Sequence, residues 1–90
     1  MYSVKILPEA EMDLAKLKKN EPTAFKKVMK LLDELIEHPT TGTGHPHLLK
    51  GDRAGHWSRS ITKKHRLVYE VRNMEVLVLV LSAYGHYDDK

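Results

Sequence analysis

Two different periods of hydrophobic and polar residues divide this chain into elements. In "YSVKIL", near the N-terminus, every second residue is apolar, which is typical of a strand. Pro8 ends this strand and suits the first turn of a helix. The acidic residues that follow it are stabilised by the positive N-terminal end of the helix dipole. Ala10, Leu14 and Leu17 then recur at helical spacing, and they predict a first helix that ends before the break at 20–22.

A second helix has the clearest pattern in the chain. Its apolar residues follow the spacing of one helical face, and lysines and carboxylates occupy the opposite face. The apolar face is expected to contain Phe25, Val28, Met29, Leu32, Leu35 and Ile36. This helix is predicted to run from about 22 to 37, where "HPTTGTG" ends it, and to serve packing or to offer a surface to a partner.

From residue 48 onward the period is two. "GHWSRSIT" and "HRLVYEV" are predicted strands, and in the second of them Arg66, Val68 and Glu70 point away from the more apolar face. "VLVLVLS" is apolar on both faces, so it is expected to be central in the sheet. The order β-α-α-β-β-β predicts one α+β domain over residues 1–90, with two N-terminal helices on one face of a largely antiparallel sheet and an open, basic opposite face.

Charge is distributed unevenly along the chain. Residues 1–40 balance seven lysines with seven carboxylates, and residues 73–90 hold one lysine and three carboxylates. Residues 41–72 hold seven Lys or Arg against two carboxylates, together with four of the six histidines. Such a basic segment favours a polyanionic partner, with nucleic acid first, although a solvated face of lysines would have the same composition.

Several classes of protein are disfavoured by the composition. There is no cysteine, so disulfides and thiolate metal sites are excluded, and neither a secretory signal nor a membrane-spanning run is recognisable. His45 and His47 flank Pro46 and could bind zinc, but a zinc site needs three or four ligands and the other histidines are scattered. We therefore expect no metal site.

Three residues could carry acid-base or phosphate chemistry. Arg66 lies within a strand, where it can grip a phosphate bidentately or form an ordinary cross-strand ion pair. His86 and Tyr87 follow the most apolar strand, where an imidazole can transfer a proton and a phenol can stack on a base. The alternative for this pair is a frayed terminus with exposed side chains.

The combination of "GTGHPHLLKG", "GHWSRSITKKHRLVYEV" and "LSAYGHY" resembles the YoeB/Txe branch of the RelE superfamily of bacterial toxins, closely so from Gly42 to Tyr87. The resemblance implies a small cytoplasmic bacterial protein with two helices packed on an antiparallel sheet. It implies a toxin that enters the ribosome and cuts messenger RNA without a metal or other cofactor. A cognate antitoxin neutralises such toxins, operator DNA is bound only by the toxin–antitoxin complex, and relatives can dimerise.

The resemblance also assigns roles to residues. Arg66 matches the arginine that stabilises the phosphate in the transition state, and His86 matches the general acid. Tyr87 matches the terminal tyrosine that helps to hold the substrate, and Lys50 matches a basic residue that contacts RNA. Further RNA contacts are expected from the histidine and the cations of the basic segment: His45, Arg53, Arg59, Lys63 and Lys64.

The chain departs from the family pattern at two positions. His47 stands where the family places a glutamate, the proposed general base. A neutral imidazole, whose unperturbed pKa is about 6.5, can also accept the 2′-hydroxyl proton, so we expect retained catalysis with a bell-shaped pH profile. Ser60 replaces a family arginine, which predicts weaker affinity for RNA or the ribosome. The alternative function is a catalytically weakened module that binds RNA, the ribosome or the antitoxin.

Overall fold

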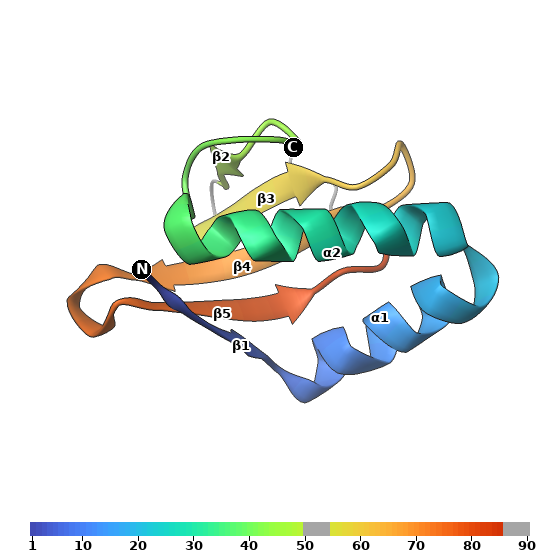
Figure 1. Cartoon of the computed structure of the whole chain (residues 1–90), viewed down its shortest axis with the longest axis horizontal. Helices are drawn as coiled ribbons and strands as arrows, with labels where there is room; N and C mark the ends of the chain where they lie inside the picture. The colour runs from blue at the N-terminus through green and yellow to red at the C-terminus, as the bar shows by residue number, and fades with distance from the viewer. Residues whose placement is uncertain (50–54, 86–90) are drawn as a thin grey trace.

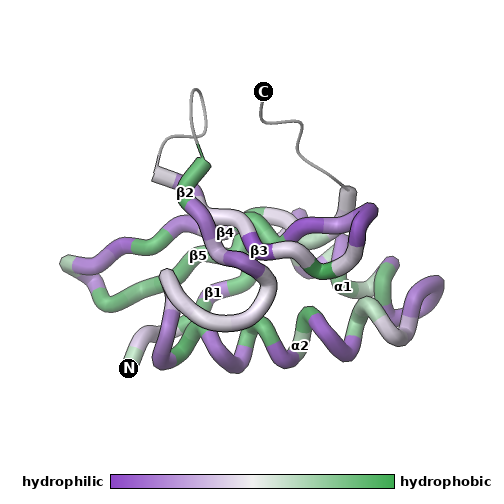
Figure 2. The backbone as a smooth tube through the Cα atoms, turned by 90° about the horizontal axis from the view of Figure 1, so that it is seen from above, coloured by the Kyte–Doolittle hydropathy of each residue, from purple (hydrophilic) through white to green (hydrophobic). Residues whose placement is uncertain are grey.

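The fold is a single sheet covered on one face by two helices. The computed structural model describes residues 1–49 and 55–85. Its elements are β1 (Ser3–Ile6), α1 (Pro8–Asn20), α2 (Pro22–Glu37), β2 (His47–Leu48), β3 (His56–Ser60), β4 (Arg66–Arg72), the 3-10 helix η2 (Asn73–Glu75) and β5 (Leu77–Ser82). The strands lie in the order β1-β5-β4-β3-β2 (Figure 1), and α1 and α2 lie together on one side of them (Figure 2). The predicted α+β class is confirmed.

Strand pairing also agrees with the expected largely antiparallel sheet. Each strand from β2 to β5 pairs antiparallel with the next one along the chain, and β1 pairs parallel with β5. β5, the strand with apolar residues on both faces, was expected at the centre of the sheet; it lies between β1 and β4, and β4 is the central strand. The two-residue strand β2 was not predicted, because two residues are too few to give a periodic pattern.

The core lies between the helices and the sheet. Its fully buried residues include Ala10, Leu17, Val28, Leu31, Leu35, Leu67, Tyr69, Val78 and Val80. Burying a leucine side chain contributes roughly 2 kcal/mol, so the buried stripe of α2 is enough to fix this helix on the sheet. The prediction for Met29 is wrong, because this side chain is 47% exposed. The buried stripe runs through 24, 28, 31 and 35, and Met29 lies at its flank.

The opposite face of the sheet is less open and less basic than expected. Val68 and Ser58 lie side by side in register at its centre, and both are buried. Glu70 on the same face accepts a hydrogen bond from Arg72 at 2.9 Å and lies 3.8 Å from His56. The face is therefore mixed, with buried small and apolar residues at its centre and charged groups around them.

Candidate active site

His47 and Arg66 lie on the same face of the sheet, away from the helices. His47 pairs with Ser58 across β2 and β3, and Arg66 pairs with Ser60 across β3 and β4. Since residues two apart on a strand share a face, His47 and Arg66 lie on one face of the sheet. Ideal strand spacings put their Cα atoms about 12 Å from each other. Arg66 Nη1 donates to Ser60 Oγ at 3.4 Å, so Ser60 gives Arg66 an acceptor.

The loop before His47 is fitted tightly to β3. Gly44 has φ +88°, and its carbonyl accepts a hydrogen bond from the Ser60 N–H at 2.7 Å. A Cβ atom at Gly44 would lie 2.9 Å from the Ser60 carbonyl oxygen, so only glycine fits both the backbone conformation and the space. His45, at φ +53°, continues this turn and is exposed. The loop therefore sets where β2 begins and where His47 lies.

The His47 ring is oriented by its own loop. Its Nδ1 lies 3.2 Å from the carbonyl oxygen of His45. Because a carbonyl oxygen can only accept a hydrogen bond, this contact favours the tautomer in which Nδ1 carries the proton. In that neutral tautomer Nε2 carries the lone pair that a general base uses.

The expectation that Arg59 contacts RNA is wrong. Its side chain is completely buried on the helix-facing side of β3. Its guanidinium donates to Tyr69 Oη at 2.9 Å, to Glu34 Oε1 at 3.0 Å, and to the carbonyl oxygens of His38, Thr41 (2.7 Å) and Thr43 (3.3 Å). Arg59 thus holds the segment that leads from α2 to His47, because three of its acceptors belong to the backbone of 38–43.

Glu34 completes this buried cluster from α2. Its carboxylate accepts hydrogen bonds from the Thr43 hydroxyl at 2.7 Å and the Thr43 N–H at 2.9 Å. These two bonds, with the nearby Arg59 charge, lower the pKa of Glu34 below its ordinary value. Burial raises the pKa of Tyr69, whose hydroxyl donates to the Pro39 carbonyl oxygen at 2.8 Å. The carboxylate and the neutral phenol are therefore the forms that the cluster favours.

Sequence reasoning missed this cluster, although one signal was available. Trp57, Arg59 and Ile61 alternate along "HWSRSI", so the period of two places Arg59 on the apolar face of its strand. A cation on an apolar face indicates a buried arginine with several acceptors rather than a surface contact.

The chain beyond β5 returns to Arg66. The Arg66 N–H donates to the Gly85 carbonyl oxygen at 2.9 Å, and the Gly85 N–H donates to His65 Nδ1 at 2.9 Å. His86, the expected general acid, follows Gly85 directly in the sequence. His86 and Tyr87, like Lys50 and Arg53, lie outside the described residues. The structure thus places Gly85, the residue before His86, next to Arg66, which shares a face of the sheet with His47.

The remaining expected RNA contacts differ in exposure. Lys63 and Lys64 are exposed in the turn between β3 and β4, directly before the strand that carries Arg66. His45 is exposed beside His47. These three side chains are accessible to a large partner, and their contact with RNA remains a proposal.

Neither a metal cluster nor a membrane helix is found in 1–49 and 55–85. No group of three or more His, Cys, Asp or Glu residues is arranged there to hold a metal ion. No helix of this part is long and apolar enough to cross a membrane.

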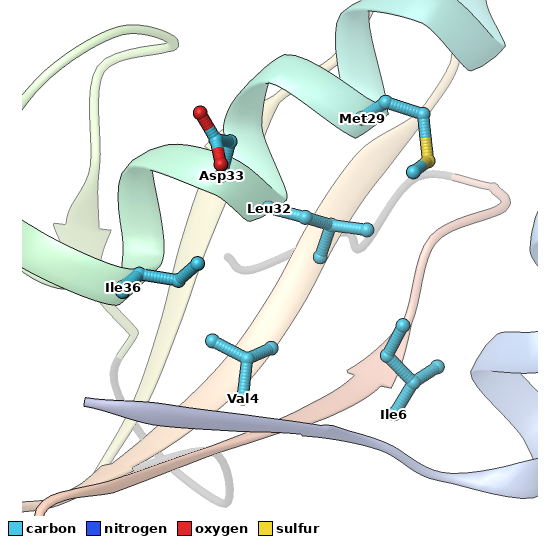
Figure 3. A pocket seen from close by; sticks show the side chains of 6 residues that line it. All are labelled: Val4, Ile6, Met29, Leu32, Asp33 and Ile36. Carbon is cyan, nitrogen blue, oxygen red and sulfur yellow. The ribbon is translucent and has the colours of Figure 1, made fainter.

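An apolar pocket lies away from the candidate site, between β1 and α2. Val4 and Ile6 of β1 line it together with Leu32 and Ile36 of α2 (Figure 3). It lies on the helix-covered side of the sheet, opposite His47 and Arg66. Asp33 is the one ionisable group among its lining residues, so the pocket offers no acid-base pair.

Comparison with known proteins decides the family. Residues 7–87 match the family model described as the YoeB-like toxin of bacterial type II toxin-antitoxin systems. This chain belongs to that family. A relative named Toxin YoeB from Mycobacterium bovis is 39% identical over 87 residues, which are 97% of this chain and 100% of the relative.

Solved structures of YoeB toxins share the whole fold. A YoeB/ParE toxin from Agrobacterium tumefaciens superimposes with a TM-score of 0.87 at 30% identity, covering 94% of this chain and 99% of its own. Two Staphylococcus aureus structures, a YoeB-YefM complex and a YoeB dimer, each have a TM-score of 0.81 and 30% identity. They cover 97% and 96% of this chain, and 99% and 98% of their own chains. The chain is thus a YoeB-type toxin of a type II toxin-antitoxin system.

Proposed function

We propose that this YoeB-type toxin is a ribosome-dependent endonuclease that cuts messenger RNA without a metal ion. The observation that carries this proposal is the position of His47 and Arg66 on one face of the sheet. The Arg66 N–H donates to the carbonyl oxygen of Gly85, the last described residue before His86. An imidazole, a guanidinium and a second imidazole are sufficient for metal-free RNA cleavage by acid-base chemistry.

The proposed reaction uses the 2′-hydroxyl of the RNA as the nucleophile, which restricts the substrate to RNA. His47 Nε2 accepts the 2′-hydroxyl proton while the 2′-oxygen attacks phosphorus. The bond from phosphorus to the 5′-oxygen breaks, and His86 donates a proton to this leaving oxygen. Arg66 stabilises the negative charge on the phosphoryl oxygens in the transition state. The products are a 2′,3′-cyclic phosphate and a free 5′-hydroxyl.

The same proposal includes the partners of the toxin. A YoeB-YefM complex of similar fold supports a cognate antitoxin as the neutralising partner, and a YoeB dimer supports pairing of two copies of this chain. Operator DNA is expected to bind the toxin–antitoxin complex rather than the toxin alone. Lys63, Lys64 and His45 are proposed to contact RNA or the ribosome, together with Lys50 and Arg53.

The experiment that tests the activity follows cleavage of a messenger RNA on programmed ribosomes. The wild type is expected to cut the message, and Arg66→Ala to slow the cleavage about 10²- to 10³-fold through loss of transition-state stabilisation. His47→Ala is expected to slow it about 10²- to 10⁴-fold, the usual contribution of a general base. Ribosomes arrested on an intact message would instead support the binding module.

His47→Glu is the matched variant that restores the carboxylate of the family pattern. A glutamate carboxylate stays unprotonated, and so able to accept a proton, to lower pH than an imidazole does. The acidic limb of the rate profile should therefore move to lower pH. If the acidic limb of the pH–rate profile is unchanged in His47→Glu, then His47 is not the general base. That result would not contradict the endonuclease activity itself.

A further inference from the structure

The segment of residues 83–85, directly after β5, is held by hydrogen bonds from three directions. The Ala83 N–H donates to Asp13 Oδ2 of α1 at 3.0 Å, and this carboxylate is buried. The Gly85 carbonyl accepts from the Arg66 N–H, and the Gly85 N–H donates to His65 Nδ1, both at 2.9 Å. The backbone that leads to His86 is therefore fixed against α1 and the start of β4.

His65 is the side chain that connects this segment to the helices. It is 3% exposed, and its Nε2 lies 2.7 Å from Glu21 Oε2. Since Nδ1 accepts the Gly85 N–H, the single proton of a neutral imidazole must be on Nε2, from which it is donated to the Glu21 carboxylate. The two contacts thus require one tautomer, and a doubly protonated ring could not accept the Gly85 N–H.

The surroundings keep this ring in place. The Tyr84 ring lies against it with a centroid distance of 4.4 Å, and Lys16 Nζ lies 5.0 Å from the Tyr84 ring centroid. Glu21 is the junction residue between α1 and α2, so both helices fix its backbone. His65 therefore links the helix junction to the residue before His86 through two directed hydrogen bonds.

We propose that His65 is a positioning residue, which acts through Gly85 to fix the backbone that leads to His86, the proposed general acid. The inference rests on the proposed endonuclease function. It assigns His65 no contact with RNA. It predicts that the Nδ1 acceptor, rather than the mere presence of a buried ring, determines the rate of cleavage.

Two substitutions test the hydrogen bonds of the two His65 ring nitrogens one at a time. The Asn carbonyl oxygen occupies about the place of Nδ1, so His65→Asn retains an acceptor for the Gly85 N–H but cannot reach Glu21. The Gln side chain reaches about the place of Nε2, so His65→Gln retains a donor to Glu21 but no acceptor for Gly85. Both variants remove a buried ring and are expected to lose similar stability, which thermal unfolding checks.

The decisive measurement is the single-turnover rate on programmed ribosomes, with the ribosome concentration varied. His65→Gln is expected to lower the maximal rate about 10- to 100-fold, the usual effect of a small misplacement of a catalytic group, with an unchanged half-saturating ribosome concentration. His65→Asn should recover most of the rate. The Gly85 amide should keep its protection from hydrogen exchange in His65→Asn and lose it in His65→Gln. His38→Gln, at an exposed histidine after α2, is the control and should match the wild type.

The outcomes distinguish this inference from the function on which it rests. A wild type that leaves the message intact would overturn the endonuclease, and the positioning role with it. A wild type that cuts, with both His65 variants equally fast or equally slow, would overturn the positioning role alone.

Discussion

At the scale of single residues, the two arginines that flank the β3–β4 turn have different roles. Arg59 is buried and binds the backbone of 38–43, whereas Arg66 is half-buried on the opposite face, where its guanidinium donates to Ser60 Oγ. Both arginines come from one basic segment of the sequence. The strand period separates them, because alternate residues of a strand point to opposite faces of the sheet.

Replacing Arg59 should therefore affect folding more than RNA affinity. Arg59→Ala leaves several buried acceptors without a donor and is expected to lower the free energy of unfolding by about 3 kcal/mol. Arg59→Lys should recover little, since an ammonium cannot reproduce the planar fork of a guanidinium. Urea unfolding measures the effect. Arg72→Ala, in an exposed ion pair, is the control and should leave the free energy of unfolding almost unchanged.

The lowered pKa of Glu34 makes part of the stability depend on pH. The folded state favours the carboxylate, so this contribution is complete well above the ordinary value of 4.5. As the pH falls below 4.5, the unfolded chain is protonated first, and the contribution is lost once the pH passes the lower folded value. Unfolding curves between pH 7 and pH 3 should show this loss. Glu34→Gln should reduce the slope with pH, and an unchanged slope would exclude Glu34 as its source.

At the scale of elements, the loop of 38–46 and the short strand β2 depend on contacts from elsewhere in the chain. The Arg59 guanidinium holds the first part of the loop, and the Ser60 N–H holds Gly44. β2 itself has only two residues, His47 and Leu48, and pairs with β3. The position of His47 is therefore set by neighbouring elements and not by any local propensity of its own.

Gly44 and Gly55 offer a matched pair for testing how closely this loop must pack. Both have positive φ, +88° and +92°, so alanine strains the backbone at either position by about 1 kcal/mol. At Gly44 the new Cβ would also meet the Ser60 carbonyl oxygen, whereas at Gly55 it meets no described atom within 4 Å. Thermal unfolding should show a clearly larger loss for Gly44→Ala. Equal losses would mean that the loop can move away from β3.

At the scale of the whole molecule, the helices and the candidate site lie on opposite faces of the sheet. α1 and α2 bury their apolar stripes on one face, and His47 and Arg66 lie on the other. The positive charge of residues 41–72 is divided by this arrangement, because Arg59 is buried while Lys63 and Lys64 remain exposed. Electrostatic attraction to RNA is therefore expected to depend on the exposed lysines.

Removing Lys63 and Lys64 together should weaken association with ribosomes more than it slows the chemical step. Loss of two phosphate contacts should lower the slope of log affinity against log salt by about 2. The control removes two exposed lysines of α2, Lys26 and Lys30, and should leave the slope unchanged. Titration with ribosomes at several salt concentrations measures both variants. Equal effects of the two pairs would indicate that net charge matters and that position does not.

The sequence by itself determined the elements whose residues repeat with a clear period. The bounds of α2, the interior strand "VLVLVLS", the α+β class and the family followed from patterns of a few to sixteen neighbouring residues. Such patterns work because the periods of helices and strands are local properties of the backbone. The likeness of the loop around His47 to the family motif was also readable without coordinates.

Only the tertiary structure decided which polar residues support the site and which can reach a partner. The burial of Arg59 against the loop of 38–43, and the link from Glu21 through His65 to Gly85, join residues far apart in the chain. The partners of a buried donor are fixed by how elements pack and not by spacing in the sequence. For this reason the sequence indicates Arg59 only as an RNA contact, and it does not single out His65.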